Sequence, residues 1–247
     1  ISFGKLAQAF VYGSKVVAIE GNFDDALRLV REIGETEPIA VVNSINPDRL
    51  EGQKTASFEI IEELGDAPDF HVLPVGNAGN ISAYWMGYEE FLGIGRSTKN
   101  PVMLGFQAAG SAPIFYNKVI EKPETYATAI RIGNPASWDK ANNAIRSSAG
   151  AIDIVTDEEI FAGQMWLASN EGIFVEPASA ASIAGLFKML NPASGRVYDA
   201  AKIPDGSRIV CTVTGHGLKD VDVAKDRCSA VITSKADKAE ILHRIGH

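Results

Sequence analysis

The sequence has 247 residues, of which 46% are hydrophobic, and its formal net charge is −8. A chain of this size can bury a large core, which suits one large α/β domain or one domain with part of another. The negative charge argues against a nucleic-acid partner, because it repels a phosphate backbone. A membrane-spanning protein is disfavoured, since no apolar run approaches the roughly 20 residues that cross a bilayer.

The two cysteines, Cys211 and Cys228, form neither a disulfide framework nor a zinc-binding spacing. Cys211 lies within an apolar run and is interpreted as a small core residue. The chain also lacks the basic-then-apolar start of a signal peptide. We therefore expect a cytoplasmic protein and no metal site.

The first quarter of the chain predicts two short strands, each followed by a helix. The apolar runs at residues 15–19 and 39–42 are the predicted strands. Residues 22–33 and 51–64 carry apolar side chains at helical spacing, which predicts a helix over each range.

The middle of the chain predicts two longer buried strands separated by a helix. The strands cover residues 70–75 and 102–108, and the helix covers residues 81–91. Prolines interrupt residues 111–134, so we expect mostly loop there, with a short helix near Glu124.

The last part of the chain again combines helices and strands. The predicted elements are a helix at 137–147, a strand at 151–155, helices at 156–172 and 179–190, a central strand at 208–214 and a helix at 235–245. Thr156 and Glu159 form a capping box at the start of one of these helices. Because the strands are apolar without alternation and alternate with helices, we predict an α/β fold, a parallel sheet covered by helices on both faces.

The first candidate site is the loop Gly76-Asn77-Ala78-Gly79-Asn80, between a predicted strand and a predicted helix. Glycines there allow the backbone to approach a ligand closely. The N–H groups at the start of the following helix would point at an anion. An ordinary Gly-rich turn is an equally good explanation of this loop taken alone.

The second candidate site is Thr214-Gly215-His216-Gly217, at the carboxyl end of a predicted strand. Ligands of open α/β sheets bind outside the carboxyl ends of strands, so this loop and Gly76–Asn80 could line one crevice. For His216 alone, a Gly turn with a surface histidine is the favoured explanation.

Two further segments are weaker candidates. Asn43, Ser44 and Arg49 follow a predicted strand and gather donors that suit a phosphate or carboxylate. The segment 176–182 places small side chains, from Ala178 to Ser182, at a predicted helix start, where they allow close approach of a ligand or tight packing. A solvated Asn-Pro turn and a packed helix explain the two segments as well.

Taken together, these segments resemble the threonine synthase family. The resemblance rests on VNSINPDRLEGQKTASFEI, HVLPVGNAGNISAYWMGY, TAIRIGNPASW, EGIFVEPASAASIAGL and CTVTGHGLKD, in this order, and covers about residues 1–222. It implies the fold of the tryptophan-synthase-β-like class, fold-type II, of pyridoxal-phosphate enzymes. It also implies conversion of O-phospho-L-homoserine and water to L-threonine and phosphate.

The resemblance assigns roles to matching positions. Pyridoxal 5'-phosphate is the implied cofactor, and a phosphorylated amino acid is the implied small-molecule substrate. The cofactor phosphate would be bound by Gly76, Asn77, Ala78, Gly79 and Asn80, and the pyridine nitrogen by the Thr214 hydroxyl. The substrate phosphate would be bound by Asn43, Ser44 and Arg49.

The resemblance further implies that the Schiff-base lysine, in a Ser-Phe-Lys-Asp type motif, lies upstream of this chain. Ser2-Phe3-Gly4-Lys5 does not match that motif. We therefore expect residues 1–55 to be the remnant of a smaller domain, the least stable part of the chain, and residues 56–247 to be the larger domain. We also expect a homodimer that is inactive as this chain alone.

Two alternatives remain open from the sequence. Another fold-type II enzyme, such as a serine/threonine dehydratase or a cysteine synthase, would share most of these motifs. A non-catalytic anion-binding fragment would retain only the phosphate loop. The donors at Asn43, Ser44 and Arg49 favour a phosphorylated substrate.

Overall fold

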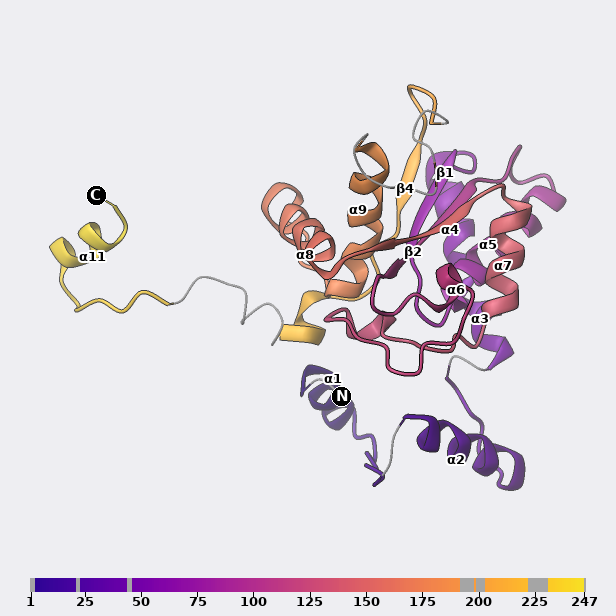
Figure 1. The fold of residues 1–247 in the computed structure, drawn as a ribbon, viewed down its shortest axis with the longest axis horizontal. Helices are drawn as coiled ribbons and strands as arrows, with labels where there is room; N and C mark the ends of the chain where they lie inside the picture. The colour runs from indigo at the N-terminus through magenta and orange to yellow at the C-terminus, as the bar shows by residue number, and fades with distance from the viewer. Residues whose placement is uncertain are drawn as a thin grey trace.

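The computed structural model describes residues 3–20, 23–43, 46–191, 198, 203–221 and 231–246. The described residues form one parallel four-stranded sheet in the order β3-β2-β1-β4 (Figure 1). The strands are β1 (Phe70–Pro74), β2 (Val102–Ala108), β3 (Ala151–Val155) and β4 (Ile209–Cys211). Each pair of neighbours is parallel, as predicted.

Helices cover both faces of the sheet, which confirms the predicted α/β class. The helices α8 (Asp157–Trp166) and α9 (Pro177–Leu190) pack on one face, and α4 (Thr55–Leu64), α5 (Gly79–Gly93) and α7 (Trp138–Ser147) pack on the other (Figure 1). The strand pleat explains the two cores. Val72 and Phe106 point into the first core, whereas Leu73 and Met103 point into the second.

The starts of several helices follow from local chemistry. The Asn46 side chain accepts a hydrogen bond from the Asp48 N–H and begins α3 (Pro47–Gln53), so the helix predicted at 51–64 is two helices, α3 and α4. Thr156 and Glu159 form the predicted capping box of α8. A π-helical turn, η2 (Leu167–Glu171), then extends α8 to Gly172.

The strands predicted at residues 15–19 and 39–42 are wrong, because both runs lack β structure. In the part of the chain that the structure describes, no strand pairs with either run. Val17 and Val42 are 83% and 82% exposed. An apolar run becomes a strand only when a neighbour completes its backbone hydrogen bonds.

Two other predictions also need correction. No helix forms near Glu124, because the Glu124 N–H bonds to the Gly110 carbonyl and draws the segment into a loop. Short helical turns lie instead at α6 (Pro113–Tyr116) and η1 (Thr128–Ile130). The strand predicted as central is β4, which is shorter than residues 208–214 and lies at the edge of the described sheet.

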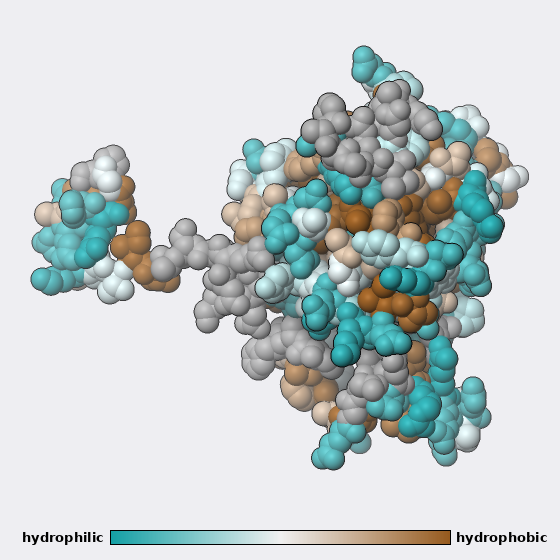
Figure 2. Space-filling view, viewed as in Figure 1, coloured by the Kyte–Doolittle hydropathy of each residue, from teal (hydrophilic) through white to brown (hydrophobic). Residues whose placement is uncertain are grey.

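The first and last helices lie outside the layered core. Below the sheet in Figure 1 are α1 (Phe3–Val11), which contacts η4 (Gly217–Asp220), and α2 (Phe23–Thr36). Figure 2 shows hydrophobic residues on the surface of this lower region. At the other end, α11 (Lys238–Arg244) lies apart from the sheet, and Asp237 caps it. None of the described helices has both the length and the apolar content to cross a membrane.

Candidate functional site

The two candidate loops both follow the carboxyl ends of strands, on the same side of the sheet. β1 and β4 are parallel neighbours, with Phe70 beside Ile209 and Val72 beside Cys211. The carboxyl ends of parallel neighbours lie on the same side of a sheet, so the loop that follows β1 and the loop that follows β4 emerge side by side. The shared crevice expected from the sequence therefore has the strand arrangement that it requires.

The turn from β1 into α5 has the geometry of an anion cradle. Gly76 has no room for a side chain, because a Cβ there would lie 2.9 Å from Ile130 Cα and 3.0 Å from the Ala129 oxygen. Ala78 adopts the left-handed conformation with φ of 62° and forms the N-cap of α5. Its methyl group cannot accept a hydrogen bond. Within the described chain, the N–H groups of Gly79 and Asn80 therefore remain available for an anion.

The two asparagine side chains of this loop shape the turn. Asn77 Oδ1 accepts a hydrogen bond from the Ala136 N–H at 2.7 Å. Asn80 Nδ2 donates to the Pro74 oxygen at 2.7 Å, and Asn80 Oδ1 accepts from the Ile81 N–H at 2.8 Å. These contacts hold the loop in shape through the two asparagine side chains.

Helix α9 supports the tip of β4. The Thr214 N–H donates to Ser179 Oγ at 2.5 Å, and Ser182 Oγ donates to the Thr212 oxygen at 2.9 Å. The Glu176 N–H donates to the Gly215 oxygen at 2.8 Å. The small residues of 176–182 are thus explained by packing, one of the two alternatives that the sequence left open.

Thr214 and His216 have different positions in the β4 loop. Thr214 is exposed at the tip, beside the edge that carries the cradle. His216 Nδ1 accepts a hydrogen bond from the Leu218 N–H at 3.1 Å and caps η4, and its ring lies edge-on to Phe174. The structural explanation favoured for His216 therefore fits its contacts.

His71 is a buried residue that sequence reasoning missed. Its Nε2 lies 2.6 Å from Thr212 Oγ1, and its Nδ1 lies 3.0 Å from the Tyr88 hydroxyl. The ring also stacks on Tyr84. Burial lowers the pKa of His71 to about 3, so the imidazole is neutral at physiological pH. His71 thereby joins β1 and α5 to Thr212, the residue that follows β4 and precedes Thr214 by two positions.

The predicted substrate-phosphate residues are only partly described. Ser44 lies outside the described residues. The Asn43 oxygen accepts a hydrogen bond from the Asn46 N–H at 3.1 Å. Arg49 is an exposed residue of α3, the helix whose Leu50 packs against Gly79 with a 3.6 Å approach to a Cβ built there. The structure therefore brings the helix of Arg49 beside the cradle.

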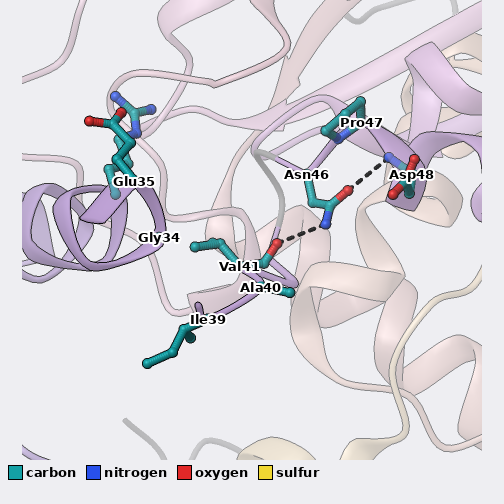
Figure 3. A pocket seen from close by; sticks show the side chains of 9 residues that line it. Gly34, Glu35, Ile39, Ala40, Val41, Asn46, Pro47 and Asp48 are labelled. Atoms are coloured by element: carbon teal, nitrogen blue, oxygen red, sulfur yellow. Dashed lines mark hydrogen bonds between the residues drawn. The ribbon is translucent and has the colours of Figure 1, made fainter. Parts of the chain in front are cut away.

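A hollow of about 430 Å³ lies between α2, the segment after it and the start of α3 (Figure 3). Its lining residues are Arg31, Gly34, Glu35, Ile39, Ala40, Val41, Asn46, Pro47 and Asp48. Asn46 Nδ2 donates to the Val41 oxygen at 2.8 Å, and Asn46 Oδ1 accepts from the Asp48 N–H at 2.8 Å (Figure 3). The lining contains one arginine and two carboxylates, which is a poor match for a phosphate.

The sequence profile of one family, described as "Pyridoxal-phosphate dependent enzyme", matches residues 1–215. The chain belongs to the pyridoxal-phosphate dependent enzyme family. Threonine synthase of Synechocystis sp. is 54% identical over 224 residues, which cover 91% of this chain and 56% of that protein. Threonine synthase of Mycobacterium tuberculosis H37Rv is 51% identical over 247 residues, which cover 100% and 66%.

The chain is thus a homologue of threonine synthases, and the resemblance stated from the sequence is confirmed. It spans 56% of the length of the Synechocystis relative and 66% of the mycobacterial one. Threonine synthase of Methanocaldococcus jannaschii is 52% identical over 254 residues, which cover 99% of this chain and 60% of that protein.

Two solved structures confirm the predicted fold class. Maize serine racemase superposes with a TM-score of 0.72 at 18% identity, covering 91% of this chain and 66% of that one. The processed form of threonine deaminase isoform 2 from Solanum lycopersicum gives a TM-score of 0.69 at 19% identity, covering 90% and 58%. At such low identity these matches concern the fold alone.

The cradle fits the phosphate group of the family's cofactor. Gly76 lets the turn pack directly against the backbone of Ala129 and Ile130, and Ala78 turns the chain so that α5 begins without a side-chain cap. Amide donors at the positive end of a helix are the donor set that a phosphate requires. Among the described residues, no group of three or more His, Cys, Asp or Glu side chains could hold a metal ion.

Proposed function

We propose that this chain is the cofactor-phosphate-binding part of a threonine synthase, which converts O-phospho-L-homoserine and water to L-threonine and phosphate. The threonine synthases that are 51% and 54% identical to the chain support this reaction. The observation that carries the proposal is the Gly76–Asn80 cradle beside the β4 tip at one sheet edge.

The residues of this edge have distinct roles in the proposal. Backbone N–H groups of Gly79 and Asn80 bind the cofactor phosphate, and the asparagine side chains keep the loop in shape. The Thr214 hydroxyl binds the pyridine nitrogen. Bound pyridoxal phosphate supplies the electron sink, and a neutral hydroxyl makes it a milder one than a carboxylate partner would.

The substrate would bind on the side of α3. The proposal assigns Asn43, Ser44 and Arg49 to the substrate phosphate, because an arginine and amide donors suit that group. Leu50 packs on the start of α5, so α3 is adjacent to the cradle. This adjacency supports a substrate that lies between α3 and the cofactor.

None of these 247 residues serves as the Schiff-base lysine in this proposal. Lys54 pairs with Glu51 and Glu90, Lys99 pairs with Asp69, and Lys188 pairs with Asp153. Hydrogen bonds to Glu51 and Glu90 raise the pKa of Lys54, which favours the protonated amine, the wrong state for a nucleophile. The amines of Lys99 and Lys188 are likewise engaged by carboxylates. We therefore expect noncovalent cofactor binding and no complete reaction by this chain alone.

Titration with pyridoxal 5'-phosphate followed by borohydride tests these assignments. The expected result is saturable binding, seen as a change in cofactor absorbance, and no stoichiometric lysine adduct after reduction. Gly76→Val should abolish the binding, because its side chain would overlap η1. A single modified lysine at full occupancy contradicts the lysine assignment, and absence of binding contradicts the cofactor site.

Isothermal titration of the chain with bound pyridoxal 5'-phosphate separates threonine synthase from the two alternative functions. O-Phospho-L-homoserine should bind more tightly than L-serine or L-threonine if the enzyme is a threonine synthase. The opposite order favours a serine/threonine dehydratase, and no binding of any of the three favours an anion-binding fragment. In a longer protein that supplies the Schiff-base lysine, phosphate release without ammonia release would mark the synthase reaction. A homodimer and a cytoplasmic location stay predictions, the first testable by light scattering.

A further inference from the structure

We infer that Thr128 and Asp220 are positioning residues whose hydrogen bond sets the separation between the two ends of the cofactor site. The inference rests on the proposed function. Thr128 Oγ1 donates to Asp220 Oδ2 at 2.6 Å, across 92 positions of sequence. Asp220 is only 4% exposed, so little water competes for this contact.

Thr128 is attached to the cradle through η1. The backbone of Ala129 and Ile130 forms the wall against which Gly76 is packed, with close approaches of 3.0 and 2.9 Å to a Cβ built there. Ile130 is buried, and its oxygen accepts a hydrogen bond from Ser111 Oγ at 3.1 Å. A shift of η1 would therefore push on the cradle.

Asp220 is attached to the β4 tip through η4. This helical turn begins three residues after Thr214 and is capped by His216. Gly217 packs on Phe174, where a Cβ would come within 2.4 Å of the ring, and its N–H donates to the Phe174 oxygen at 3.1 Å. A shift of η4 is thereby transmitted to Thr214 along a short, well-packed segment.

The sheet itself fixes the two loops only in part. The ladder between β1 and β4 covers Phe70–Val72 and Ile209–Cys211, and it ends before either loop begins. Beyond that ladder, the contact of Thr128 with Asp220 joins the neighbours of both loops. A ligand that touches both loops needs a set distance between them, whereas a ligand held by the cradle alone does not.

This distinction gives a test with two ligands. Pyridoxal 5'-phosphate would span from the cradle to Thr214, whereas inorganic phosphate would touch the cradle only. Thr128→Val keeps the shape of the side chain but removes the hydroxyl, so it should weaken pyridoxal phosphate binding by roughly tenfold, the effect of losing one hydrogen bond to a charged group. Phosphate affinity should change less than about twofold. Thr128→Ser retains the hydroxyl and should bind both ligands like the natural chain.

The outcomes separate this inference from the proposed function. Equal losses for both ligands, or no loss for either, in Thr128→Val would overturn the positioning role. A natural chain that binds phosphate but not pyridoxal phosphate would overturn the proposed function as well. Melting temperatures of both variants show whether a loss reflects unfolding.

Hydrogen exchange of the natural chain gives a second test that needs no variant. Pyridoxal phosphate should slow exchange at residues 76–81 and 215–220 together, because it would contact both loops. Phosphate should slow exchange at 76–81 alone. If pyridoxal phosphate leaves 215–220 unchanged, the two loops are not coupled and the inference is wrong.

Discussion

The backbone N–H of Thr214 donates a hydrogen bond to the hydroxyl oxygen of Ser179 over 2.5 Å. The contact fastens the tip of β4 to the first turn of α9, at a point where the sheet ladder has already ended. A serine buried at a helix start thus does for the strand tip what a neighbouring strand would otherwise do.

Ser179→Ala tests this support directly. It removes the acceptor of a half-buried N–H group, so we expect a loss of about 1–2 kcal/mol in the free energy of unfolding. Urea denaturation measures the loss. Ser169→Ala makes the same chemical change at an exposed position and should be nearly neutral. Equal stability of the two variants would show that the Ser179 contact contributes nothing.

Gly76→Ala should lower both stability and phosphate affinity. Its Cβ would lie 2.9 Å from Ile130 Cα, so the cradle or η1 must move. We expect a loss of about 1–3 kcal/mol, as for other overpacked sites. In the matched control, Gly52→Ala, the new methyl group meets nothing within 4 Å and lies in a helix, so it should stabilise the chain by about 1 kcal/mol. Phosphate titration of both variants completes the comparison.

His71 should make stability dependent on pH below neutrality. Its folded-state pKa of about 3 lies below the usual histidine pKa of 6.5. Between these values the unfolded chain binds the extra proton, so stability is complete above pH 6.5 and falls as pH decreases. The slope approaches about 1.4 kcal/mol per pH unit.

Urea denaturation at pH 7 and pH 5 measures this effect. His71→Gln should lose less stability between the two pH values than the natural chain, because glutamine does not titrate. His243→Gln is the control, since it makes the same substitution at an exposed position on α11. Identical pH dependence in all three proteins would mean that His71 is not held neutral.

The buried ion pair between β3 and α9 should be costly to break from one side. Lys188 Nζ lies 3.2 Å from Asp153 Oδ1 and donates to the Ile154 oxygen at 2.6 Å. Asp153→Ala removes the carboxylate from a buried ammonium, which should cost about 3–5 kcal/mol. The double variant Asp153→Ala, Lys188→Met should recover much of that loss. Urea denaturation of the natural chain, the two single variants and the double variant measures these free energies of unfolding. If the losses of the two single variants simply add in the double variant, the ion pair does not have the predicted coupling.

The sequence predicts well those features that depend on neighbouring residues. The runs at 70–75, 102–108 and 151–155 match β1, β2 and β3, because each strand is a buried apolar run bounded by turn residues. The capping box of Thr156 and Glu159 needs only a four-residue window. The cradle is equally local, since Gly76 to Asn80 form one turn.

Features that depend on distant partners could not be predicted in this way. The runs at 15–19 and 39–42 have strand composition, but no described strand pairs with them. His71 sits in an apolar run, where nothing in the adjacent sequence indicates its bonds to Thr212 and Tyr88. Such contacts join residues that become neighbours only once the chain has folded.

Ala78 gives the cradle a property that glycine would not. Its left-handed backbone, with φ of 62°, costs a residue with a side chain roughly 1–2 kcal/mol. Ala78→Gly would relieve that strain, yet it would also let the turn adopt more backbone conformations. By tolerating the strain, the protein keeps its amide donors preorganised, so an arriving anion does not have to order the loop that receives it.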